Sequence, residues 1–90
     1  MTRAYDNEHD PDVIAFRTEL GQRLQTARHG AGLSQLDAAC MAGLMTQASL
    51  SNYETGKRDI HVRTLVALAG VYGVPVQSFL RGATTKMAVA

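Results

Sequence analysis

The sequence predicts an all-α fold built from five short helices. Apolar residues recur at spacings of three and four along most of the 90 residues, which is the period of a helix that buries one face. Valine and isoleucine are sparse, and no long stretch alternates apolar with polar residues, so the sequence gives little support for β-strands. Glycines separate the helical segments and leave short connections between them.

The first helix is expected to begin at Pro11 and to end near His29. Asp10 can cap the free N–H groups of its first turn, and proline is tolerated at the first helical position. Glycines at positions 30 and 32 then break the helix. Its apolar face consists of Phe16, Leu20, Leu24 and Ala27.

The second helix is expected between Ser34 and Gly43. Ser34 and Asp37 form a pair similar to a capping box. Small inward side chains would let this helix pack closely against its neighbours. The inner face is predicted to contain Leu36, Ala39, Cys40 and Ala42.

Thr46 is the expected cap of a third helix over residues 47–55, with Leu50 and Tyr53 facing inward. A fourth helix is expected over about residues 62–72. Since His61 is a poor cap for it, we expect Asp59 to take over that role. A last short helix is expected over residues 75–80. The buried residues of the fourth helix are predicted to be Leu65, Leu68, Ala69 and Tyr72.

Charge is distributed unevenly along the chain. Residues 1–12 contain four carboxylates and one arginine, whereas residues 13–90 contain eight Lys/Arg and four Asp/Glu. We expect residues 1–10 to be a disordered acidic tail, residues 11–82 a folded domain and residues 83–90 a C-terminal tail. A cytoplasmic protein is expected, because the sequence shows no signal peptide and no apolar run of about 18 residues.

Residues 33–35 (LSQ), Gly43 and residues 50–58 (LSNYETGKR) resemble the helix-turn-helix of the phage Cro/repressor-type (XRE) regulators. The likeness covers about residues 13–81. Within it, residues 51–80 resemble the DNA-binding domains of BldD-type regulators of actinobacteria. The resemblance implies a compact five-helix, lambda-repressor-like DNA-binding domain. One departure is an additional residue between Gly43 and Leu50, which we place in the turn near Leu44 and Met45.

The third helix is the candidate for insertion into DNA, because the major groove accepts one helix and its outward face is short and polar. Glutamine and asparagine can pair with adenine through two hydrogen bonds, and a methyl group can contact thymine. By the resemblance, base contacts are assigned to Thr46, Gln47, Ala48, Ser51 and Asn52. Phosphate contacts are assigned to Gln35, Lys57, Arg58 and Arg63.

The resemblance also implies an ion pair between Arg28 and Glu54, which would prevent a carboxylate on the third helix from repelling DNA. The implied function is a transcriptional repressor that binds a palindromic operator as a homodimer, since one helix reads only about four or five base pairs. Two roles stay open for the last helix, a dimer interface that residues 87–90 extend, or closure of the monomer core. The residues concerned are Val76, Phe79 and Leu80.

A second functional hypothesis is a protein-interaction module on the same fold, such as an antitoxin or a phage adaptor for a host protein. An enzyme is not expected, because the sequence contains no phosphate-binding loop and no nucleophile motif. We expect no cofactor. The three histidines do not combine with Cys40 in a metal-ligand spacing, so no metal is expected either.

Overall fold

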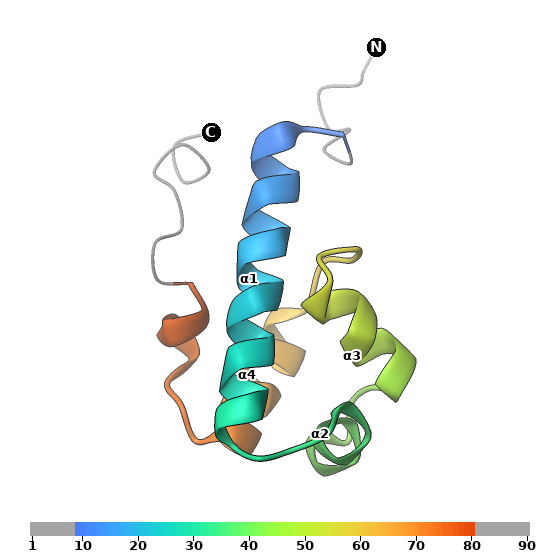
Figure 1. The fold of residues 1–90 in the computed structure, drawn as a ribbon, viewed down its shortest axis with the longest axis vertical. Helices are drawn as coiled ribbons and strands as arrows, with labels where there is room; N and C mark the ends of the chain where they lie inside the picture. Colours follow the sequence, from blue (N-terminus) through green and yellow to red (C-terminus); the bar gives the residue numbers. More distant parts are fainter. Residues whose placement is uncertain (1–8, 81–90) are drawn as a thin grey trace.

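A computed structural model describes residues 9–80, which form four α-helices and one 3-10 helix (Figure 1). The long helix α1 lies against α3 on one side and against η2 on the other, and α2 lies across one end of the molecule. Residues 1–8 and 81–90, which include most of the first predicted tail and all of the second, lie outside the described residues. The elements are α1 (Pro11–Gly30), α2 (Gln35–Ala42), α3 (Gln47–Glu54), α4 (Val62–Tyr72) and η2 (Val76–Phe79).

The prediction of five helices is correct for the first four and wrong for the fifth. The last segment forms a 3-10 helix of four residues, in which Ser78 N–H donates to the Pro75 carbonyl at 2.9 Å. The segment is short, and its hydrogen bonds follow the tighter i→i+3 pattern of a 3-10 helix in place of an α-helical one.

Side-chain caps define the starts of the first three helices. Asp10 Oδ1 accepts a hydrogen bond from Asp12 N–H at 2.8 Å, so Asp10 belongs to the folded domain and not to the tail in which we had included it. Ser34 and Thr46 cap α2 and α3 in the same way, through the N–H groups of Asp37 and Ser49. These hydrogen bonds satisfy N–H groups that have no partner within their own helix.

The hydrophobic core lies where α1, α3, α4 and η2 meet. Leu24, Leu50, Leu68 and Phe79 are its largest fully buried side chains, and each comes from a different one of these elements. Because each of these four elements contributes one of the side chains, the core forms only when all four elements are packed together.

The predicted inner face of α2 is partly wrong. Ala38, Ala39 and Ala42 pack into the core, whereas Cys40 is exposed and Leu36 is 55% exposed. Residues 38, 39 and 42 lie on one side of a helix, and residues 36 and 40 lie together on its flank. With only eight residues, α2 buries a narrow alanine face against α3 and α4 and leaves the larger side chains outside.

Two glycines bring α1 into direct contact with the end of α3. A Cβ atom on Gly21 would lie 2.6 Å from the carbonyl oxygen of Tyr53 and closer still to that of Glu54. Gly56, which has a positive φ of 76°, lies against the backbone of Thr18. Only glycine allows this approach of two backbones, so these positions determine where α3 sits on α1.

We expect Gly21→Ala to lower the free energy of unfolding by about 1–3 kcal/mol or more, because backbone carbonyls cannot move aside for the new methyl group. Gly70→Ala is the matched control. Gly70 is also helical and exposed, and a Cβ there would meet nothing within 4 Å. The control should raise stability by up to about 1 kcal/mol. Urea unfolding measures both, and equal effects of the two variants would contradict the close approach.

Candidate nucleic-acid interface

Helices α2 and α3 and the turn between them form a helix-turn-helix unit. Helix α2 ends at Ala42, and Gly43 follows it in the left-handed conformation with a φ of 72°. Thr46 is the N-cap of α3, so the turn comprises residues 43–46. Within it, Met45 packs against the core and Leu44 is exposed. These are the two positions near which we place the additional residue.

The first turn of α3 faces solvent. Gln47 and Ala48 are exposed, whereas Leu50, within the same turn, is fully buried. Thr46 is also exposed, but its hydroxyl group caps the helix and donates to Ser49 Oγ at 3.2 Å, which leaves its methyl group for outside contacts. Ser51 and Asn52, one turn later, are half-buried. The predicted base-contacting residues are thus most accessible at the N-terminal end of α3.

The last turn of α3 is held by a buried ion pair. Arg28 Nε donates to Glu54 Oε2 at 2.7 Å, and Arg28 Nη2 donates to Glu54 Oε1 at 3.0 Å. Arg28 Nη1 also donates to the Leu33 carbonyl at 2.9 Å. The carboxylate of Glu54 is therefore neutralised inside the protein, as the resemblance implies, and one arginine connects α1, the α1–α2 loop and α3. The pKa of Arg28 is raised above its usual value, mainly because the side chain donates these hydrogen bonds to the Glu54 carboxylate.

Gln35, a predicted phosphate-contacting residue, takes part in the same network. Its amide nitrogen donates to Glu54 Oε1 at 3.0 Å, and the side chain is half-buried. A primary amide has two N–H donors, so the second remains available for a DNA phosphate. Gln35 thereby joins the start of α2 to the end of α3.

The other predicted phosphate-contacting residues, Lys57, Arg58 and Arg63, are all exposed. Asp59 does not cap α4, contrary to our prediction. Its carboxylate lies 3.7 Å from Arg17 Nη1, and His61 is the N-cap residue without a side-chain hydrogen bond. Three exposed cations therefore lie in the segment that joins α3 to α4 and in the first turn of α4.

The family-model comparison matches residues 19–79 to the helix-turn-helix domain model. This range includes both helices of the unit and every residue of the Arg28–Glu54–Gln35 network. The chain belongs to the helix-turn-helix domain family. No curated protein sequence matches the chain significantly.

Solved structures show the same fold. The chain is 33% identical to the DNA-binding domain of BldD, with a TM-score of 0.66, covering 73% of this chain and 94% of that one. The chain is 28% identical to the restriction-modification controller protein C.AhdI from Aeromonas hydrophila, with a TM-score of 0.68, covering 72% of this chain and 97% of that one. It is 24% identical to the clp gene regulator ClgR from Corynebacterium glutamicum, with a TM-score of 0.70, covering 82% of this chain and 78% of that one. The resemblance predicted from the sequence is confirmed, and the descriptions of all three are of regulators or a DNA-binding domain, not of enzymes.

Sequence reasoning missed two residues of this helix-turn-helix domain, Gly21 and Arg17. A glycine inside a long helical pattern is a signal of close packing, because it costs about 1 kcal/mol relative to alanine. Arg17 is buried and lies three and seven residues before Leu20 and Leu24, so it shares their face of α1. A cation on a buried face indicates a partner for its charge.

The residues predicted for the last helix fall into two groups, one buried in the protomer core and one that remains partly accessible. Phe79 is 1% exposed and packs in the protomer's own core, so it has no surface to offer a second subunit. Leu80 is 40% exposed and Val76 is half-buried. Only Val76 and Leu80 therefore remain as candidates for a dimer contact, and residues 87–90 lie outside the described part of the chain.

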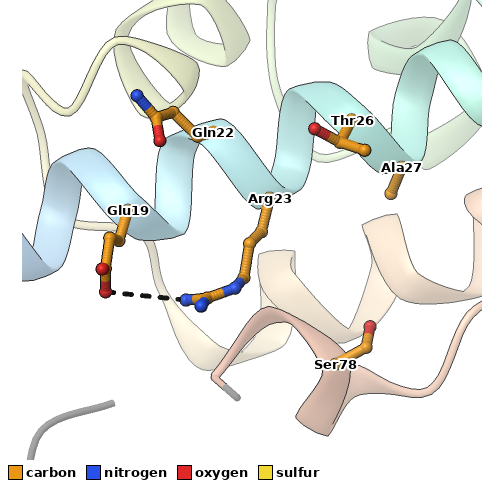
Figure 2. A pocket seen from close by; sticks show the side chains of 6 residues that line it. All are labelled: Glu19, Gln22, Arg23, Thr26, Ala27 and Ser78. Carbon is orange, nitrogen blue, oxygen red and sulfur yellow. Dashed lines mark ion pairs between the residues drawn. The ribbon is translucent and has the colours of Figure 1, made fainter. Parts of the chain in front are cut away.

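A pocket of about 460 Å³ lies between α1 and η2 (Figure 2). Glu19 and Arg23 form an ion pair across one turn of α1 at 3.7 Å, and Ala27 and Ser78 lie at the other end. By helical spacing the pocket residues of α1 lie on the flank opposite to Arg17, Thr18 and Gly21, which contact the segment after α3. Among residues 9–80 no group of three potential metal ligands occurs, and no helix is long and apolar enough to span a membrane.

Breaking the buried ion pair should destabilise the domain strongly. We expect Glu54→Leu or Arg28→Met alone to lower the free energy of unfolding by about 3–5 kcal/mol, because each leaves a buried charge without its partner. The double variant should lose much less than the sum of the two. A double-mutant cycle by chemical denaturation measures this coupling, and additive losses would show that the two side chains do not interact.

Burial raises the pKa of Tyr72 to about 12, with a smaller contribution from the nearby Glu54 carboxylate. Its unfolded value is near 10, so the folded state keeps a proton that the unfolded state loses. Stability should therefore be fully present below pH 10 and fall between about pH 10 and 12. Tyr72→Phe should remove part of this fall. The ionisation of Tyr72 is measured by tyrosinate absorbance during an alkaline titration. Ionisation of Tyr72 near pH 10 would contradict the raised pKa.

Proposed function

We propose that this helix-turn-helix domain is a sequence-specific regulator that binds double-stranded DNA and acts as a repressor on a palindromic operator. The observation that carries the proposal is the composition of the surface around α3. Its first turn presents Gln47 and Ala48 to solvent, while Glu54, the one carboxylate on the helix, is 5% exposed and paired with Arg28. A neutral, polar helix face is what the major groove accepts.

The flanks of this face are suited to the phosphate backbone. Lys57, Arg58 and Arg63 are exposed cations that follow α3, and Gln35 keeps one N–H donor at the start of α2. Contacts of this kind supply affinity and orientation, and the side chains on α3 supply sequence preference. The similarity to the DNA-binding domain of BldD supports DNA as the target. Since the proposed target is DNA, we place the protein in the cytoplasm.

A homodimer is part of the proposal. One α3 helix reads too few base pairs for useful selectivity, and a twofold arrangement with half-sites one helical turn apart doubles the recognised sequence. Val76 and Leu80 are the candidate contact residues in the described part of the chain.

A protein-interaction module is the second candidate, and a specific observation favours it. Leu36, Met41 and Leu44 are large apolar residues of α2 and the following turn, and each is at least 45% exposed. Exposed apolar side chains of this kind can be buried by a protein partner. The two functions are compatible, because these residues lie outside the proposed base-contacting set.

The test is selection from a pool of random double-stranded DNA, followed by sequencing of the bound fraction. The expected result is a palindrome with half-sites one helical turn apart. The logarithm of affinity should fall with the logarithm of salt concentration at a slope near −4 to −5, if the dimer neutralises about four to six phosphates. Absence of any enriched sequence together with a flat salt response would exclude the DNA-binding function and favour the interaction module.

Gln47→Ala and Lys57→Ala should then separate the two kinds of contact. We expect Gln47→Ala to reduce discrimination at one base pair of each half-site by about 1–3 kcal/mol. Lys57→Ala should weaken binding to all sequences alike and make the salt slope shallower by about one per protomer. Fluorescence anisotropy with operator and single-substitution duplexes measures both. Identical profiles for the two variants would mean that α3 does not read bases.

A further inference from the structure

The end of α3 and the segment that follows it are attached to α1 by three successive contacts. Gly21 of α1 lies against the carbonyl groups of Tyr53 and Glu54, Thr18 lies against Gly56, and Arg17 pairs with Asp59. The segment therefore runs along α1 toward its N-terminal end, beside the middle of the helix in Figure 1. The first two contacts are between backbones, and the third is made by side chains alone.

Lys57 and Arg58 lie between the second and third of these contacts. Lys57 N–H donates to the Asn52 carbonyl at 2.9 Å, which fixes the backbone at the start of this stretch. Neither cation forms an ion pair within residues 9–80. Their direction therefore depends on how the backbone around them is held, and Asp59 is the next residue that is tied to α1.

The Arg17–Asp59 pair is asymmetric in its burial. The Arg17 side chain is 8% exposed, whereas that of Asp59 is 78% exposed. A buried guanidinium is a fixed positive charge at the surface of α1, and an exposed carboxylate reaches it from the segment. Asp59 also stands directly after two proposed phosphate-contacting residues, where a negative charge would by itself repel DNA.

We propose that Arg17 and Asp59 are positioning residues for DNA binding, which hold the 57–59 segment so that Lys57 and Arg58 face the phosphate backbone. This inference rests on the proposed function. A cation held in place before binding loses less conformational freedom on contact than one on a loose loop. The gain from orienting two cations then exceeds the repulsion from one carboxylate.

The two effects of Asp59 have opposite signs, and this makes the proposal testable. If Asp59 only repels DNA, Asp59→Asn raises affinity for every sequence. If Asp59 positions the two cations, the same variant lowers affinity despite the loss of a negative charge. An ion pair with one exposed partner is worth up to about 1 kcal/mol, so the expected loss is about two- to fivefold.

The experiment compares Asp59→Asn with Asp37→Asn in the full chain, using the operator found by selection. Asp37 is an exposed carboxylate on α2 that takes part in no ion pair within residues 9–80. Asp37→Asn removes one negative charge, so it has the same net charge as Asp59→Asn. We expect Asp59→Asn to bind less tightly with a shallower salt slope, and Asp37→Asn to bind equally or more tightly. Equal or raised affinity for Asp59→Asn would overturn the proposal.

Two further measurements separate positioning from folding and from the proposed function. Arg17→Lys keeps the charge and should retain most of the affinity, whereas Arg17→Met should lose as much as Asp59→Asn, with no further loss in the double variant. Amide hydrogen exchange at Lys57 and Arg58 in the free protein should be faster in Asp59→Asn than in the wild type. If the wild type bound no DNA, the proposed function would fail, and unchanged exchange would separately refute the attachment of the segment.

Discussion

The ion pair between Arg28 and Glu54 is the interaction on which the rest of the interface depends. It places the only carboxylate of α3 inside the protein, and the same guanidinium fixes the loop that precedes α2. Burying both charges carries a desolvation cost, which two hydrogen bonds between them and a third from Gln35 offset. Arg28 thus ties α3 and the loop before α2 to α1, and Gln35 joins the start of α2 to the same carboxylate.

Helix α1 acts as the platform for the side of the molecule that is proposed to face DNA. Its glycine at position 21 lets the end of α3 approach closely, its Thr18 backbone receives Gly56, and its arginines at positions 17 and 28 each take a carboxylate from the α3 side. Residues 17, 21 and 28 are separated by four and seven positions, and residue 18 lies three before residue 21, so all four occupy one face of the helix. The opposite flank carries the open pocket that ends at Ser78, so the two flanks of α1 are available for different roles.

The sequence predicted the four α-helices closely, because their boundaries depend on local signals. Proline at the first position of α1, Ser34 and Thr46 as caps, and glycine after α2 and α4 act within a few residues of where they stand. The failures concern properties that need the tertiary structure. Helical spacing predicts that Leu36 and Cys40 share a side of α2, but not that the alanine face is the one that finds neighbours. Asp59 was expected to cap α4 because the sequence does not show that Arg17 lies beside it.

The base-contacting set was predicted through a family resemblance, and the structure adds a physical reason why such a set can vary. Helix α3 has eight residues, so it makes little more than two turns. Its first turn carries Gln47 and Ala48 on the outside, whereas its last turn carries Glu54 in the buried network. In the proposed function the exposed first turn of α3 contacts bases, and Glu54 in the last turn anchors the helix beside Ser51 and Asn52 of the proposed set. Gln47 and Ala48 are exposed, so substitutions there leave the buried Arg28–Glu54 pair intact. We expect them to alter DNA preference with little loss of stability.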